Sequence, residues 1–217
     1  MNREKIRQQI HDPNCNICLR LCSALEEVKK AYPSYFCAPV PSFGPIDVEL
    51  LIVGLAPGLH GANATGRPFT GDHAGLLLFE TLHKYGFSNR ALSVSNDDGL
   101  KLNNCRIINA VKCWPPKNKP TLQEIKNCNG FLKHEIAASK PKIILSLGKV
   151  AHEAVLRSLF LRPSDFQFRH SQVHRLCSNG IILINSYHCS RYNTQTGRLS
   201  NEMFYAIFDR ILTILDS

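Results

Sequence analysis

The sequence predicts an α/β fold of three layers (α/β/α), with a central, mainly four-stranded parallel sheet and a cysteine-bearing N-terminal segment. One observation is that four short runs of Ile, Val and Leu are continuous rather than alternating, as in strands covered on both faces. The other is that a segment with helical spacing of apolar residues follows each run. Alternating strands and helices indicate a parallel sheet with helices on both faces.

The four predicted strands are VELLIVG (48–54), RIINAV (106–111), KIILSLG (142–148) and GIILINS (180–186). The helices predicted after them span residues 74–87, 121–139, 149–160 and 200–216. Thr121 and Glu124 open the second of these helices with the spacing of a capping box. Ligands of such sheets bind outside the carboxyl ends of the strands, so we expect the loops after the first, second and fourth strands to share one crevice.

The chain is expected to form one domain, residues 1–217, in which residues 1–45 make a distinct N-terminal segment. This segment holds the run PNCNICLRLC, a short predicted helix over 23–32 and an extended, proline-rich stretch. No apolar run approaches the roughly 20 residues that span a bilayer, and the polar start lacks the apolar core of a secretory signal. These features predict a cytoplasmic protein without a membrane partner.

The chain is basic, with 26 Lys and Arg against 17 Asp and Glu, a net charge of +9 and a pI near 9.2. Such a balance suits a polyanionic partner such as nucleic acid, because phosphates that are neutralised release their counterions. A basic surface kept for solubility gives the same composition, so charge alone leaves both interpretations open.

The loop after the first strand, GLAPGLHGANATGRPFTGD (54–72), is unusually rich in glycine, which indicates that something approaches its backbone closely. Gly61 and Gly66 have the spacing of a phosphate-binding loop, but Arg67 and Pro68 stand where the lysine and hydroxyl residue belong. No Gly-x-Gly-x-x-Gly fingerprint is present there either. Nucleoside-triphosphate chemistry is therefore disfavoured.

The same loop resembles the first active-site motif of the uracil-DNA glycosylase superfamily, and most closely its type b, or family 5. NAVKCWPPKNKPTLQEIKNC (109–128) is similar to the second region of that family, and HCSRYNTQTGRLS (188–200) to its third, a histidine loop. A related branch has glutamate after the first glycine, where this chain has Leu55. The resemblance covers nearly the whole chain, with its blocks in the right order.

The resemblance implies a monofunctional DNA glycosylase that hydrolyses the bond between uracil and deoxyribose and leaves an abasic site. It also implies activity on hypoxanthine or modified uracils. The implied partner is DNA that contains uracil or another deaminated base, and the implied protein is a monomer of the prokaryotic cytoplasm. Such an enzyme extracts one nucleotide from the duplex and holds it in a tight pocket.

Three residues are the candidate catalytic groups: Asp72, Asn109 and His188. The resemblance implies that Asp72 positions water and stabilises the sugar cation, although an Asp directly before a helix is also a standard N-cap. It implies that Asn109 reads the uracil edge and that His188 donates to uracil O2. A structural role is the alternative for both, since a buried asparagine amide needs a partner.

The resemblance places the base against the glycine-rich loop, with Phe69 as the aromatic on which uracil stacks. A core aromatic at a helix entrance is the alternative for Phe69. The candidate substrate-binding residues are Gly54, Ala56, Gly58, Phe69 and Asn109.

Nine cysteines in a chain expected in the cytoplasm favour a metal or cluster role for those that are well spaced. Cys15 and Cys18, with Cys113 and Cys128, match the four cluster ligands of the family, and residues 1–45 are then a cluster-binding segment. Spacing fits either zinc or a 4Fe–4S cluster; the resemblance implies 4Fe–4S, with zinc as the runner-up. Cys22 is a competing ligand. The remaining cysteines are expected to be core or incidental: Cys22, Cys37, Cys105, Cys177 and Cys189.

The histidine loop departs from the family pattern, because Cys189 and Arg191 replace two prolines that would stiffen it. Tyr192 matches the side chain that wedges into the vacated base stack, although an exposed loop without a DNA role is the alternative. The candidate DNA-binding residues are Arg191, Tyr192, Lys112 and Arg198, with Lys117 and Lys119 beside them.

A second function class remains open: an iron–sulfur or zinc α/β protein that binds nucleic acid without catalysis. The two classes differ in what they require, because a binding module has no need of Asp72, Asn109 and His188 together. All three are present, which favours the enzyme.

Overall fold

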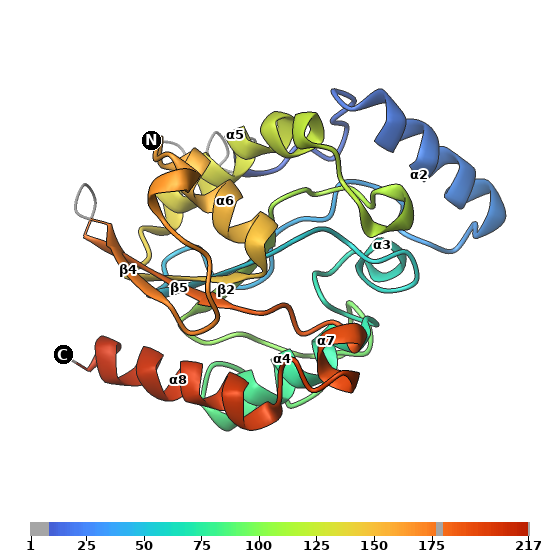
Figure 1. The fold of residues 1–217 in the computed structure, drawn as a ribbon. Helices are drawn as coiled ribbons and strands as arrows, with labels where there is room; N and C mark the ends of the chain where they lie inside the picture. Colours follow the sequence, from blue (N-terminus) through green and yellow to red (C-terminus); the bar gives the residue numbers. More distant parts are fainter. Residues whose placement is uncertain (1–8, 177–179, 217) are drawn as a thin grey trace.

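A central sheet of five strands in the order β2-β1-β3-β5-β4 organises the computed structural model, which describes residues 9–176 and 180–216 (Figure 1). Its strands are β1 (Leu50–Gly54), β2 (Cys105–Asn109), β3 (Ile143–Leu147), β4 (Val173–Leu176) and β5 (Ile181–Ser186). The first three and β5 pair in parallel, which confirms the four predicted strands. The antiparallel edge strand β4 was not predicted, because its sequence VHRL is polar and only partly buried.

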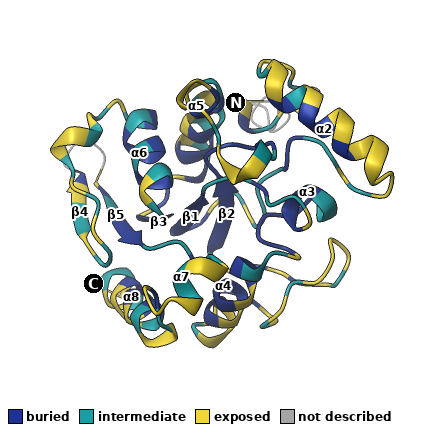
Figure 2. Cartoon of the chain, turned by 45° about the vertical axis from the view of Figure 1, so that its right-hand side comes forward, coloured by how far each residue is buried: buried dark blue, intermediate teal, exposed yellow. Residues whose placement is uncertain are grey.

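The helices lie on both sides of this sheet, which confirms the three-layer prediction (Figures 1 and 2). They are α2 (Leu19–Ala31), α3 (Ala62–Thr65), α4 (His73–Lys84), α5 (Leu122–Ser139), α6 (Lys149–Ser158), α7 (Arg191–Gln195) and α8 (Asn201–Leu215), with short 3-10 turns η1 (Pro116–Asn118) and η2 (Pro163–Asp165). Thr121 and Glu124 form the predicted capping box of α5. In the described part of the chain, no helix has the length and apolar character needed to cross a membrane.

Burial on both faces explains the continuous apolar runs of the strands. In β1, Leu50 and Ile52 pack with α4 and α8, whereas Leu51 and Val53 pack with α5 and α6. Successive side chains of a strand point to opposite faces, so a strand between two helical layers has no solvent-facing position. Figure 2 shows β1, β2, β3 and β5 as the buried centre of the molecule, with β4 more exposed at the edge.

The strand order also decides where a ligand can bind. The chain leaves β1 toward β2 on one side, and it leaves β3 toward β4 and β5 on the other. Connections that diverge in this way open a crevice at the carboxyl ends of the strands.

A buried ion pair joins β2 to α5. Arg106 donates from Nε to Glu135, whose side chain is completely buried, and Ser42 donates to the other carboxylate oxygen at 2.6 Å. Arg106 also donates to the Gly44 carbonyl, so the pair holds the proline-rich N-terminal stretch against the sheet.

Removing one partner of this pair should therefore destabilise the fold strongly. We expect Glu135→Ala to lower the free energy of unfolding by about 3–5 kcal/mol, because the Arg106 charge then stays buried without a partner. Glu153→Ala breaks only the pairs that the half-buried Glu153 makes with Lys149 and Arg157 on the surface of α6, and it should cost less than about 1 kcal/mol. Denaturant unfolding measures both; equal losses would contradict the role of the buried pair.

Candidate active site

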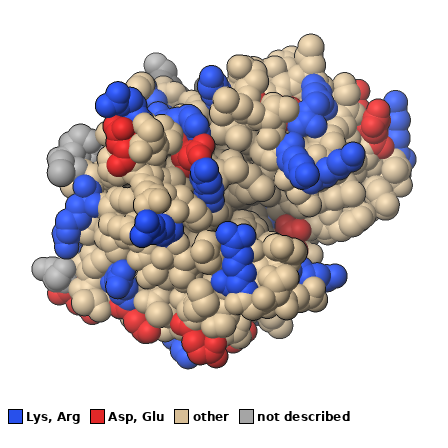
Figure 3. All heavy atoms as spheres, viewed as in Figure 1, with Lys and Arg blue, Asp and Glu red and all other residues tan. Residues whose placement is uncertain are grey.

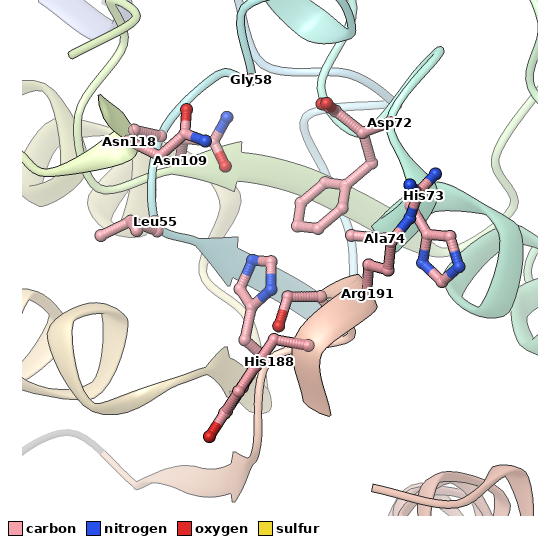
Figure 4. A pocket seen from close by; sticks show the side chains of 13 residues that line it. Leu55, Gly58, Asp72, His73, Ala74, Asn109, Asn118, His188 and Arg191 are labelled. Atoms are coloured by element: carbon pink, nitrogen blue, oxygen red, sulfur yellow. The ribbon is translucent and has the colours of Figure 1, made fainter. Parts of the chain in front are cut away.

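A pocket of about 480 Å³ opens at the carboxyl ends of the strands, within the usual size range of small-molecule sites (Figure 4). Its walls come from the loops after β1, β2 and β5, as the topology predicts. The lining residues are Leu55, Ala56, Gly58, Phe69, Asp72, His73, Ala74, Asn109, Asn118, His188, Ser190, Arg191 and Tyr192. The structure thus brings together the three candidate catalytic residues and most of the candidate substrate-binding residues.

Asp72 stands at the N-cap position of α4, but its side chain does not cap that helix. Its carboxylate instead accepts from the backbone N–H of Ala62 at 3.2 Å. A Cβ atom on Gly58 or on Gly61 would overlap this carboxylate. These glycines are therefore needed for the close approach of Asp72, and the N-cap alternative is wrong.

Burial raises the pKa of Asp72 above its ordinary value of 3.8. The backbone amides of Ala62 and Gly58 and the nearby His60 oppose this shift, because each favours the ionised form. The carboxylate is thus partly desolvated at the edge of the pocket, where it can hold a water molecule or face a cation.

Phe69 forms one wall of the pocket and is locked in place by its neighbours. Its backbone has a φ of 60°, which is rare for an aromatic residue and persists only where the surroundings enforce it. A Cβ on Gly54 would come within 2.7 Å of the Phe69 ring, and a Cβ on Gly75 would overlap the Phe69 carbonyl oxygen. Gly54 therefore lies beneath the pocket rather than lining it.

Asn109 is the last residue of β2, where it pairs with Gly54 of β1. Its residue is only 6% exposed, yet its amide makes no side-chain hydrogen bond within the described residues and faces the pocket. The alternative of an amide that binds backbone is thereby contradicted.

His188 lies opposite Phe69, with the two rings 5.9 Å apart and nearly parallel at 23°. Burial lowers the pKa of His188 to about 4, so its imidazole is neutral at physiological pH. Neither ring nitrogen has a hydrogen-bond partner among the described residues, which leaves an N–H available to a ligand.

The histidine loop is fixed without the prolines that the family pattern contains. Cys189 is fully buried in the core on the α8 side of the sheet. Ser190 caps α7 by accepting from the Asn193 backbone, and the Asn193 side chain donates to the His188 carbonyl at 2.8 Å. Packing and capping therefore take the place of proline in holding His188.

The candidate DNA-binding residues separate into two groups. Arg191 and Tyr192 lie exposed at the pocket rim, and Arg198 is exposed outside it, with its guanidinium over the Tyr187 ring. Lys112 as a phosphate contact is wrong, because the residue is only 2% exposed and its ammonium lies near Ser42. Several pocket residues were not predicted: Leu55, His73, Ala74, Asn118 and Ser190.

Leu55 was noted only as the residue that replaces glutamate of a related branch, and His73, Ala74 and Ser190 were not singled out. Asn118 did carry a sequence signal, since it follows the turn WPPK and adopts a φ of 55°, a conformation that asparagine tolerates. Its side chain accepts from the Trp114 indole at 3.2 Å, which fixes it beside the pocket.

The N-terminal cysteines lie close to Cys113 and Cys128. Burial and the nearby thiols of Cys128, Cys15, Cys22 and Cys18 raise the pKa of Cys113. Cys113 and Cys128 belong to one core cluster, with Cys18 packed against it. The predicted helix over 23–32 begins earlier, at Leu19, so Cys22 lies on α2 near the same group.

Four cysteine thiolates suit either zinc or a 4Fe–4S cluster. In the described part of the chain, no group of three or more His, Cys, Asp or Glu residues is arranged to hold one metal ion. Cys105 is buried, as expected for a core cysteine. Cys177 lies outside the described residues.

The fold and pocket together define a three-layer α/β protein that takes a small ligand at the carboxyl ends of its strands. The family model for the uracil DNA glycosylase superfamily matches residues 41–212 of this chain. The chain is 42% identical over 213 residues to the type-5 uracil-DNA glycosylase of Thermus thermophilus, covering 95% of each chain. It is 41% identical over 201 residues to that of Pyrobaculum aerophilum, covering 91% of this chain and 87% of the relative.

A type-4 uracil-DNA glycosylase of Pyrobaculum aerophilum is similar over a shorter region, with 35% identity over 118 residues and 54% of this chain covered. The chain therefore belongs to the uracil-DNA glycosylase superfamily and, within it, to the type-5 group.

The neutral state of His188 can be measured directly. We expect its imidazole resonances to stay unchanged between pH 8 and pH 5 and to titrate with a pKa of about 4, because burial disfavours the charged ring. NMR titration of the protein measures this, and the spectrum of His188→Gln assigns the resonance. A pKa near 6.5 would contradict the burial of this ring.

Proposed function

We propose that this protein removes uracil from DNA by hydrolysing the N-glycosidic bond, leaving an abasic site. The observation that carries the proposal is the convergence of Asp72, Asn109 and His188 on one pocket beside Phe69. A module that only binds nucleic acid has no need of a carboxylate, an amide and a neutral imidazole around one cavity. The names and similarity of the type-5 relatives support the same conclusion.

Recognition of the base rests on Phe69 and Asn109. A flipped uracil would stack on the Phe69 ring, and the Asn109 amide would accept from N3–H and donate to O4. Cytosine presents the opposite pattern at these two positions, so the amide selects uracil when its Oδ1 points at N3–H and its Nδ2 at O4. Hypoxanthine and modified uracils are proposed as further substrates of this pocket.

Cleavage rests on His188 and Asp72. As the bond to C1′ breaks, the base leaves with the bonding electrons, and the His188 N–H stabilises the charge that develops on O2. The ionised Asp72 stabilises the positive sugar and orients water. That water adds to C1′ and loses one proton to solvent, and the departing uracil anion takes up one proton from solvent. The low pKa of His188 serves this role, because a neutral imidazole remains a donor at physiological pH.

We propose a structural 4Fe–4S cluster held by Cys15, Cys18, Cys113 and Cys128, with Cys22 as an alternative ligand. Bound there, it would tie residues 1–45 to the loop after β2 and to α5 within a single domain of residues 1–217. It supplies no chemistry to the pocket. The protein is proposed to act as a monomer in the prokaryotic cytoplasm.

The first test uses a labelled oligonucleotide with one uracil, treated with hot alkali after incubation. We expect breakage at uracil with the native protein, none in a thymine control, and none with His188→Ala. Absence of breakage with fully metallated native protein in every base context would overturn the proposal in favour of a binding module.

The pH dependence of kcat/KM should show the titration of Asp72. Its ionised form is the active one and its pKa is raised, so kcat/KM should fall with decreasing pH from a value above the ordinary 3.8. Asp72→Asn should lower kcat by about 100-fold or more and remove this acid limb. A limb that survives in Asp72→Asn would assign it to another group.

The wedge role of Tyr192 predicts a difference between substrates. Tyr192 is 69% exposed at the pocket rim, so Tyr192→Ala should reduce kcat/KM on duplex DNA more than on single-stranded DNA, where no base stack has to be opened. Equal losses on both substrates would rule out the wedge.

The cluster proposal predicts about four iron and four acid-labile sulfide per chain in protein purified without oxygen. Metal analysis with sulfide determination measures this. One zinc per chain without sulfide would establish the runner-up, and Cys22→Ser with unchanged iron content would remove Cys22 from the ligand set.

A further inference from the structure

A second groove runs on from the catalytic pocket and shares Asp72, His73 and Arg191 with it. It has a volume of about 360 Å³. Its remaining walls are Gly71, Gly75, Leu76, Leu92, Ser93 and Val94. None of these six residues has a role in the proposed reaction. In the space-filling view, the surface of the molecule is hollowed, with Lys and Arg side chains near the hollow (Figure 3).

Three large apolar side chains of this groove face solvent. Leu76, Leu92 and Val94 are 53%, 56% and 68% exposed. Single exposed apolar residues are ordinary, but a group of three beside a binding pocket indicates an interaction surface.

The loop that carries Leu92 and Val94 is held firmly. Arg67, which is only 2% exposed, donates to Ser93 Oγ at 2.8 Å and to Asp98 Oδ2 at 2.6 Å. Asp98 in turn accepts from the Val94 backbone N–H at 2.8 Å. Because Arg67 belongs to the glycine-rich loop, the apolar side chains are fixed relative to Asp72 rather than left on a free loop.

The junction of the groove and the pocket is polar. Arg191 is exposed there and lines both cavities. His73 lines both as well, and its Nδ1 is buried without a hydrogen-bond partner among the described residues. Figure 4 shows both side chains on the Asp72 side of the pocket. An anionic ligand at this junction would pair with Arg191.

We propose that this groove is a subsite for the nucleotide that adjoins the excised one, a proposal that rests on the proposed function. Arg191 binds the phosphate between the two nucleotides, and Leu92 and Val94 pack against the sugar and base of the neighbour. The covalent link supports this occupant, because a nucleotide held beside Asp72 must pass its strand out through an adjoining opening. Apolar side chains commonly contact bases in this way.

The test compares Leu92→Ser/Val94→Ser with Phe160→Ser. Phe160 is 80% exposed, follows the end of α6 and lines neither the pocket nor the groove. Three single-stranded substrates are used: one with an internal uracil, one with uracil at the 5′ end and one with uracil at the 3′ end. Melting temperatures establish that all variants are folded.

On the internal uracil, the double variant should lose about tenfold in kcat/KM, mainly through KM, whereas Phe160→Ser should match the native protein. On the terminal substrate that lacks the neighbour in the groove, the native protein and the double variant should be equal. A double variant that matches Phe160→Ser on the internal uracil would overturn the subsite, as would an equal loss on all three substrates. If the native protein excises no uracil at all, the proposed function fails instead.

Discussion

The seating of the Asp72 carboxylate on the backbone of Gly58–Ala62 is the contact on which the rest of the site depends. The carboxylate accepts from the backbone of this loop instead of from the first turn of α4, so α4 begins without a side-chain cap. This contact requires two positions without a Cβ, and it places a carboxylate where burial raises its pKa. Glycines of this loop are thus needed because side chains of the same protein pack against its backbone, even without a ligand.

Burial acts on two ionisable groups of the pocket, Asp72 and His188, and disfavours the charged form of both. It lowers the pKa of His188, which remains a neutral donor, and it raises the pKa of Asp72, a shift that backbone amides oppose. In the proposed reaction, the neutral imidazole serves the leaving base and the carboxylate serves the sugar. Phe69 and Asn109, the proposed base-binding residues, both lie so close to Gly54 that a Cβ atom there would overlap them.

The strands could be predicted from the sequence because both faces of each are buried, which leaves a continuous apolar run. The edge strand β4 could not, since one side of VHRL meets solvent. Lys112 was assigned to the surface by its charge, but the structure buries it near Ser42, Glu135 and the cysteines. The expected topology places the loops that carry Asp72, Asn109 and His188 at one crevice. Only the resemblance singles out these three residues within those loops. Leu92 and Val94 belong to no recognisable sequence motif. Their position beside the pocket depends on the ion pair of Arg67 with Asp98, which holds their loop.

The central claim is that Gly58 and Gly61 are glycine because the Asp72 carboxylate packs against their backbone. Comparing Gly61→Ala with Gly130→Ala in the uracil-excision assay tests this claim most directly. A Cβ at Gly130 meets nothing within 4 Å, so that variant should keep its activity. Gly61→Ala should remain folded by melting temperature but lose most of its kcat, because the new methyl group displaces the carboxylate. Native activity in Gly61→Ala would contradict the account.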